Sequence, residues 1–283
     1  MSEKSKLTPA EKKRAEATRW QRIFLAATGL CALTYLLNIL LSEIRSGNAW
    51  GLGYGTAATV LMVGAALFGW RRRSMSFVSR RGLGRSRVWL YFHIYGGTLF
   101  LLLLLMHTGF RLPRGAMTQG LWLLSLWTAL SGVIGLVLQK WIPRALASGL
   151  SIEVNYDRIP ELIDQIRERS EKLAAGCSDT AQRLYRRKIA VALAGPHRSL
   201  MYFIDITGGI QSRLKELRYL QRLQEGDERQ RLDELERLFR AKLEIDAHYT
   251  LQQALRFWLY LHVPMSLLLL AFVAVHIFMV WYY

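Results

Sequence analysis

Two apolar segments of this sequence each carry a pair of histidines with the same spacing. His93 and His107 lie in the segment LYFHIYGGTLFLLLLLMHTGF, and His262 and His276 lie in the segment LYLHVPMSLLLLAFVAVHIFMVWYY. Fourteen residues are nearly four helical turns, so the rings of each pair fall within about 40° on one helix face, about 21 Å apart. An ionisable ring in hydrocarbon is costly and usually functional. The two pairs therefore predict a functional site built from two helices.

The two pairs are expected to meet at matching depths in the membrane. The first histidine of each pair follows an arginine by six residues: Arg87 precedes His93, and Arg256 precedes His262. If both helices run in the same direction, the first histidines face each other near one membrane surface and the second histidines near the other. Each level then offers two neutral imidazoles, which suit the axial positions of a haem iron, whereas structural zinc takes four ligands in a closed tetrahedron. A proton relay and a channel or transporter site are the alternative interpretations.

Small and basic residues near the histidines fit a haem. Gly96 and Gly97 lie on the same helical face as His93 and leave room for a flat macrocycle, although close helix packing explains glycines equally well. Gly109 is a similar candidate beside His107. Haem propionates could pair with basic residues that membrane topology alone would also explain, and these are Arg87, Arg111, Arg114 and Arg256.

Two residues after His262 are candidates for orienting its ring. Pro264 must free a backbone carbonyl of its helix, and Ser266 lies one turn beyond the histidine. Either oxygen could accept a hydrogen bond from the imidazole N–H.

Five apolar runs are long enough to cross a membrane, because about 20 helical residues span the hydrocarbon layer. Tryptophans lie at or near the ends of the runs, as is typical of side chains at the headgroup level. The first run follows a charged arm and is too long for the core of a cleavable signal peptide. The runs cover residues 23–41, 50–70, 88–110, 121–138 and 257–283. The sequence predicts an all-α integral membrane protein whose five transmembrane helices form a haem-binding bundle.

The basic excess of the chain is interpreted as a topology signal. The chain has 52% hydrophobic and 21% charged residues and a net charge of +17. Basic residues cluster in the arm before the first run and in the loop 71–87, and basic loops mark the cytoplasmic side. We therefore expect a multi-pass membrane protein with a cytoplasmic N-terminus and an external C-terminus; the family resemblance described below implies that the membrane is a bacterial inner membrane. Membrane lipid is an expected partner, and nucleic acid is not, because no binding motif accompanies the charge.

Four regions follow from these patterns. Residues 1–22 are a basic cytoplasmic arm, 23–140 hold four transmembrane helices, 141–255 form a mostly helical cytoplasmic domain between helices four and five, and 256–283 form the fifth transmembrane helix. Apolar stripes predict a helix near Pro160 and a helical hairpin that breaks at Gly226. Short strands or extended segments are expected over 151–156 and 200–206.

The region 141–255 lacks the motifs of several common cofactor sites. It contains neither GxGxxG nor GxxxxGK[ST], so no dinucleotide or nucleotide fold is expected. His197 and His248 stand singly and are interpreted as ordinary histidines. Cys31 and Cys177 are expected to be free thiols, and no CxxCH motif for covalent haem is present.

The paired HisX13His motifs resemble those of bacterial di-haem transmembrane cytochromes b, a group that includes ferric-reductase-like proteins. The resemblance covers the spans and not the region 141–255. It implies two b-type haems, an inner one between His93 and His262 and an outer one between His107 and His276. The last segment also resembles the final helix of cytochrome-b-like proteins that are linked to multihaem c-type cytochromes. Unlike ferric reductases and NADPH oxidases, the chain has no FAD- or NADPH-binding region.

These observations and the resemblance predict a transmembrane electron conduit. Its expected role is the quinol-oxidising subunit of a respiratory complex of the quinol:cytochrome c oxidoreductase type. Electrons would arrive from a quinol or another subunit. A separate c-type cytochrome, conceivably multihaem, would dock at the outer face, and residues 141–255 could bind a cytoplasmic partner. Two alternatives stay open: a haem-containing membrane sensor or scaffold, and an outer-face reductase of iron or oxygen.

Overall fold

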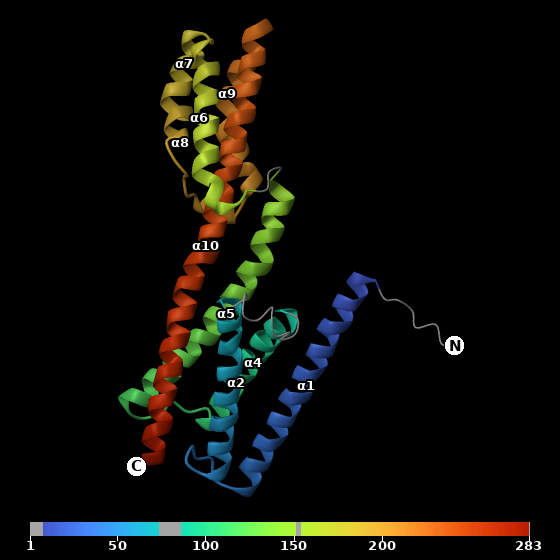
Figure 1. Cartoon of the computed structure of the whole chain (residues 1–283), viewed down its shortest axis with the longest axis vertical. Helices are drawn as coiled ribbons and strands as arrows, with labels where there is room; N and C mark the ends of the chain where they lie inside the picture. The colour runs from blue at the N-terminus through green and yellow to red at the C-terminus, as the bar shows by residue number, and fades with distance from the viewer. Residues whose placement is uncertain (1–7, 74–85, 151–153, 283) are drawn as a thin grey trace, which may run out of the picture. The chain divides into compact units, whose positions relative to one another are not determined.

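The computed structural model describes residues 8–73, 86–150 and 154–282, and within these ranges the chain is helical and has no strand (Figure 1). Five of the described helices are long and apolar enough to cross a membrane. They are α1 (Pro9–Leu41), α2 (Ala49–Arg73), α4 (Ser86–His107), α5 (Ala116–Gly149) and α10 (Gly226–Tyr282). Each covers all or most of one of the five apolar runs, so the all-α class and the multi-pass character of the chain agree with the sequence prediction.

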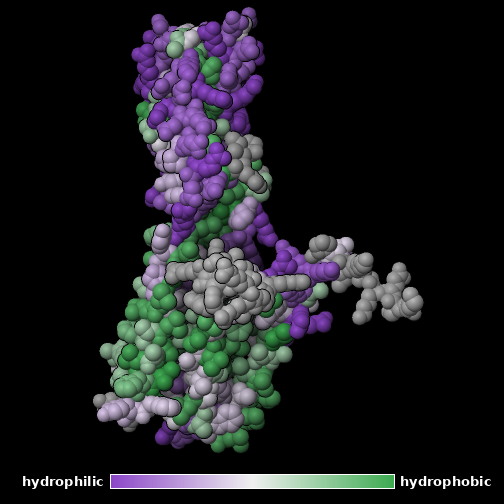
Figure 2. All heavy atoms as spheres, in the orientation of Figure 1, coloured by the Kyte–Doolittle hydropathy of each residue, from purple (hydrophilic) through white to green (hydrophobic). Residues whose placement is uncertain are grey.

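The chain divides into two compact units. The membrane unit comprises Met1–Ile134 and Leu261–Tyr283, and the helical domain comprises Gly135–Tyr260. α5 and α10 each contribute residues to both units. The membrane unit has a mainly hydrophobic surface and the helical domain a mainly hydrophilic one (Figure 2), as expected if only the first is surrounded by lipid.

In the membrane unit, α4 packs against both α1 and α2. Its buried face presents Gly96, Phe100, Leu103 and Met106. These side chains join a core with Tyr54, Ala58 and Met62 of α2, Leu121 of α5 and Leu269 of α10. The spacing of three or four residues is that of one helix face, so the same packing that fills this core also fixes the rotation of α4 about its axis.

The basic arm predicted for residues 1–22 is helical from Pro9 onward and continues into the first span. Thr8 and Glu11 form a capping box: the Glu11 N–H donates to the Thr8 hydroxyl over 3.3 Å, and the Thr8 N–H donates to the Glu11 carboxylate over 2.7 Å. Pro9 follows at the first helical position, where its missing N–H costs nothing. The motif Thr-Pro-Ala-Glu therefore starts α1 about four turns before the apolar run.

The helical domain surrounds the first half of α10 with short helices (Figure 1). They are η1 (Tyr156–Arg158), α6 (Ile159–Ala175), α7 (Asp179–Leu184), the π-helix η2 (Tyr185–Ile189), α8 (Ala190–Leu193), η3 (Leu200–Phe203) and α9 (Ile206–Arg222). The predicted hairpin is confirmed: α9 and α10 flank a break where Gly226 has a φ of +64°. The helix predicted near Pro160 is α6, which begins at Ile159.

The prediction of a strand over 200–206 is wrong. Residues 200–203 form the 3-10 turn η3, and α9 begins at Ile206. The Asp205 carboxylate caps α9 by accepting the Gly208 N–H over 2.8 Å, which favours a helix start over an extended chain. Of the segment 151–156, residues 151–153 lie outside the described residues, and Tyr156 belongs to η1.

A fully buried ion pair lies on α10 inside the helical domain. Lys242 Nζ is 2.7 Å from Asp246 Oδ2, and both side chains are completely buried. The Asp246 carboxylate also accepts the His197 N–H over 2.9 Å. Burial raises the pKa of Asp246 and lowers the pKa of Lys242, and the attraction between the two charges opposes both shifts. The directions indicate that desolvation outweighs the attraction, as is common for buried pairs.

Removing one partner of this pair should destabilise the domain far more than removing both. Asp246→Leu leaves the Lys242 charge buried and unpaired, which is expected to cost about 3–5 kcal/mol. Lys242→Met with Asp246→Leu should recover most of that loss. Thermal unfolding of the full chain in detergent, followed by circular dichroism, measures both effects. A double variant as unstable as the single one would show that the charges themselves stabilise the fold.

Candidate functional site

The first pair of histidines meets across the interface of α4 and α10. The ring centroids of His93 and His262 lie 6.3 Å apart, and the ring planes make an angle of 80°. A metal ion between two opposed imidazoles, each bound at about 2 Å, would separate the ring centroids by about 6 Å. The planes of two such ligands can take any angle about their common axis. The spacing between the rings therefore suits an ion held between them.

Hydrogen bonds from these rings to neighbouring helices select which ring nitrogen carries the hydrogen. His93 Nδ1 lies 3.0 Å from the backbone oxygen of Ala65 in α2. A carbonyl can only accept, so Nδ1 of the neutral ring carries the hydrogen and Nε2 keeps its lone pair. A second-sphere acceptor of this kind also fixes the ring orientation and raises the basicity of the free nitrogen.

His262 is held in the same way by a side chain of α5. Its Nδ1 lies 2.8 Å from the Ser131 hydroxyl, which also donates to the Thr128 carbonyl over 3.0 Å. If the hydroxyl hydrogen is directed to the Thr128 carbonyl, the oxygen accepts from His262 Nδ1. For His93, the hydrogen bond to Ala65 leaves Nε2 as the candidate ligand atom.

The first histidine of α4 has a counterpart fourteen residues later on the same helix. His107 Nδ1 lies 2.8 Å from the backbone oxygen of Gly51 in α2, which again leaves Nε2 free. His276 is half-buried in α10. The rings of His93 and His262 are neighbours, and the pairing of His107 with His276 stays a prediction.

A glycine of α2 makes room for the His107 ring. A β-carbon on Gly55 would lie 3.0 Å from His107 Nδ1 and 3.1 Å from its Cε1, a tight contact that the ring would relieve by shifting by a few tenths of an ångström. The carbonyl that accepts from His107 belongs to Gly51, one turn earlier on the same face of α2. Gly51 and Gly55 thus shape the site that the His107 ring occupies.

The acceptors on α2 have the same spacing as the histidines on α4. Gly51 and Ala65 are fourteen residues apart, as are His107 and His93. Because the sums of the paired residue numbers are equal, the two helices run antiparallel with one constant register over four turns. One packing interface therefore orients the rings at both levels. Residues 51, 55, 65 and 131 were not anticipated as ring partners.

The glycines predicted beside His93 have different surroundings. Gly96 is buried, and a β-carbon there would meet only the Phe92 ring at ordinary contact distance. A β-carbon on Gly97 would meet no atom within 4 Å, so open space adjoins this position. Gly109 lies beyond α4 with a φ of +60°, and its N–H donates to the Met106 carbonyl. Gly109 therefore serves the turn that ends α4.

All four predicted propionate partners are exposed; Arg87, Arg111 and Arg114 lie at or beyond helix ends, and Arg256 lies within α10. Arg87 lies 3.5 Å from Glu16, Arg111 follows the end of α4, and Arg256 forms an ion pair with Asp157 at 3.1 Å. Their role toward a haem stays a prediction.

Ser266 contacts the backbone of His262 and not its ring. Its hydroxyl donates to the His262 carbonyl over 2.7 Å, so Ser131 takes the position that the sequence suggested for Ser266 or for the carbonyl freed by Pro264. The two single histidines are in the helical domain, where His197 is exposed and His248 is buried beside Gln252.

The residues of both levels fit a haem better than a bare metal ion. No group of three or more His, Cys, Asp or Glu side chains that could hold a metal lies within the described ranges. If each level supplies two imidazoles, a porphyrin would provide the other ligands of an iron. The open space at Gly97 and the Nε2 atoms of His93 and His107 agree with such a group.

Comparisons of the chain with protein-family models, with curated proteins and with solved structures gave no match. The candidate site is therefore defined by the spacing of the histidines and by their hydrogen bonds to α2 and α5.

Short-range crosslinking tests the pairing of the histidines without reference to any cofactor. In a chain with Cys31→Ser and Cys177→Ser, the variant His93→Cys/His262→Cys should be bridged by a short bis-thiosulfonate reagent, because the two rings are neighbours. His93→Cys/His276→Cys is the mismatched control, since these positions differ by four helical turns. Mass spectrometry of proteolytic fragments detects the bridge. Equal crosslinking of both variants would contradict the assigned pairs.

Substitution of Gly55 should disturb one level only. Gly55→Leu places a side chain where the His107 ring lies, so the protein should lose the haem of the 107/276 level and keep the other. Gly53→Leu is the matched control, because a β-carbon there meets no atom within 4 Å and the residue is exposed. Haem is quantified per chain in purified protein. If the two variants bind equal amounts of haem, Gly55 does not shape a haem site.

Proposed function

We propose that this protein carries electrons across a membrane through two haems of b type. His93 and His262 would hold one haem, and His107 and His276 would hold the other. The observation that supports the proposal is the tautomer of His93 and His107: each donates Nδ1–H to a carbonyl of α2 and keeps the lone pair of Nε2 for a ligand.

The protein residues supply ligation, orientation and a dry environment, and haem supplies the one-electron chemistry when bound. The two levels are about 21 Å apart along the helices, which is most of the thickness of the hydrocarbon layer. Apolar side chains of α2, α4 and α10 fill the core between the levels and exclude water there. Such an arrangement would give an electron two redox centres within the hydrocarbon layer.

The proposal extends to the source and the acceptor of the electrons. The sequence has no dinucleotide-binding motif, so a quinol or a separate redox subunit would deliver electrons. A c-type cytochrome at the outer face would accept them, and the basic residues near the inner ends of the spans favour a bacterial inner membrane with the helical domain in the cytoplasm. In this role the protein would be the membrane subunit of a quinol:cytochrome c oxidoreductase.

Electron transfer into sealed vesicles tests the proposal. The vesicles hold trapped ferricyanide and contain the haem-loaded protein. When an impermeant reductant is added outside, the trapped ferricyanide should be reduced and its absorbance should fall. His276→Ala removes one ligand of the second level, so its rate should fall to the leak of protein-free vesicles. His197→Ala, an exposed histidine of the helical domain, is the control and should keep the full rate. Wild-type vesicles that bleach no faster than protein-free ones would refute transmembrane conduction.

A further inference from the structure

The helical domain carries a cluster of unusually exposed apolar side chains in and just after η3. Leu200 is 81% exposed, Met201 54% and Ile204 89%. Tyr202, between them, is buried at 2% exposure, so the segment is anchored to the domain and turns its other side chains outward. We call Leu200, Met201 and Ile204 the apolar apex. Contiguous exposed apolar residues of this size mark a surface that meets another apolar phase.

The apolar apex lies beside the end of the apolar run of α5. The Phe203 ring stacks on Trp141 with the ring centroids 6.0 Å apart and the planes at 11°. Trp141 follows the predicted run 121–138, and Val137, one turn earlier, is 58% exposed. The apex is therefore adjacent to the place where α5 changes from an apolar to a charged helix, which is where a membrane surface is expected.

Contacts with α10 place the apex at the same level. The Ser199 N–H donates to the Thr250 hydroxyl over 3.4 Å, and the next apolar run of α10 begins at Phe257, about 10 Å further along the helix. Phe257 itself is 64% exposed within the domain. Two independent helices thus indicate that the apex is within reach of the headgroup region.

A stack of arginines and tyrosines borders the apex. Arg198 lies over the Tyr249 ring at 5.8 Å, Tyr249 stacks on Tyr156 at 5.5 Å, and Arg256 lies over Tyr156 at 3.8 Å. Arg198 and Arg256 are both exposed. Tyrosine rings and arginines with apolar stems and charged ends are the side chains that favour the membrane–water interface.

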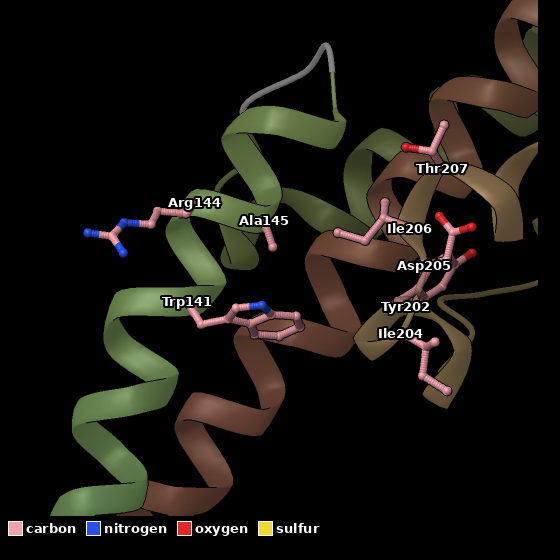
Figure 3. A pocket seen from close by; sticks show the side chains of 8 residues that line it. All are labelled: Trp141, Arg144, Ala145, Tyr202, Ile204, Asp205, Ile206 and Thr207. Atoms are coloured by element: carbon pink, nitrogen blue, oxygen red, sulfur yellow. The ribbon is translucent and has the colours of Figure 1, made fainter.

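A cavity separates the apex from α5. It has a volume of about 440 Å³ and lies between Trp141 and Ile204, with Tyr202 and Ile206 among its lining residues (Figure 3). The Tyr202 hydroxyl is buried and has no hydrogen-bond partner. Arg144 belongs to the rim, but its guanidinium extends away from the cavity (Figure 3). The lining is mixed, because Asp205 and Thr207 lie beside the apolar side chains (Figure 3). The apex is thus not sealed against α5.

The geometry points to a lipid-docking surface at the apolar apex of the helical domain. Leu200, Met201 and Ile204 enter the boundary between headgroups and acyl chains of the adjacent leaflet, and Arg198 and Arg256 meet lipid phosphates beside them. Amphipathic segments commonly insert to this depth with apolar side chains inward and cations at the headgroups. The domain is then attached to the membrane at the apex as well as through α5 and α10. This role is independent of electron transfer.

Site-directed fluorescence in vesicles tests the docking surface. In the full chain with Cys31→Ser and Cys177→Ser, Met201→Cys is labelled with an environment-sensitive dye and reconstituted in vesicles that contain phosphatidylglycerol. Leu223→Cys, 60% exposed at the far end of α9, is the matched control. The label at 201 should emit at shorter wavelength and be quenched several-fold more strongly by lipids with a nitroxide near the headgroup.

A second variant separates insertion from simple proximity. Leu200→Ser/Ile204→Ser with the label at 201 should shift the emission toward that of water while the haem content stays unchanged. A label at 201 that emits as in water and is quenched no more than the label at 223 would overturn the proposal and leave the apex as a surface for a protein partner.

Discussion

The orientation of the histidine rings depends on hydrogen bonds between imidazole Nδ1–H groups and oxygens of neighbouring helices. A neutral imidazole in an apolar bundle has one donor and one acceptor, and leaving either without a partner costs free energy. The carbonyls of Ala65 and Gly51 satisfy the donors of His93 and His107. The acceptor nitrogen of each ring then remains for a ligand. The rings are thus set before any ligand binds, which reduces the cost of holding one.

The packing of α2 against α4 maintains these bonds at both levels. A mid-helix carbonyl is normally shielded by the side chains one turn later, and Gly55 removes that shield from the Gly51 carbonyl. A change in the register of α2 by one residue would move each acceptor by about 1.5 Å along the helix axis and by about 100° around it. The tight core around Tyr54, Ala58, Met62 and Phe100 opposes such a change. Ring orientation at one level is therefore coupled to packing at the other.

The sequence predicted the features that depend on local pattern. The five apolar runs and the hairpin around Gly226 follow from run length and glycine position, and the approach of His93 to His262 agrees with the helical repeat. The acceptors could not be predicted in this way, because Gly51, Ala65 and Ser131 become partners only through the register between helices. The start of α1 at Pro9 had a local signal, the capping residues Thr8 and Glu11, that the charge of the arm obscured. The segment 200–206 resembled a strand in sequence because it is apolar. In the structure it forms the turn η3 and the start of α9, which Asp205 caps, and its apolar side chains are partly exposed and partly buried.

The haem content of the wild-type chain is the most direct measure of the central claim, that each histidine pair holds one haem. Protein that is expressed with ample haem supply and purified in mild detergent should contain two haems per chain. Its reduced-minus-oxidised absorption spectrum should be that of low-spin haem b with two imidazole ligands. A colourless protein, or a spectrum of high-spin haem with an open axial position, would contradict the account.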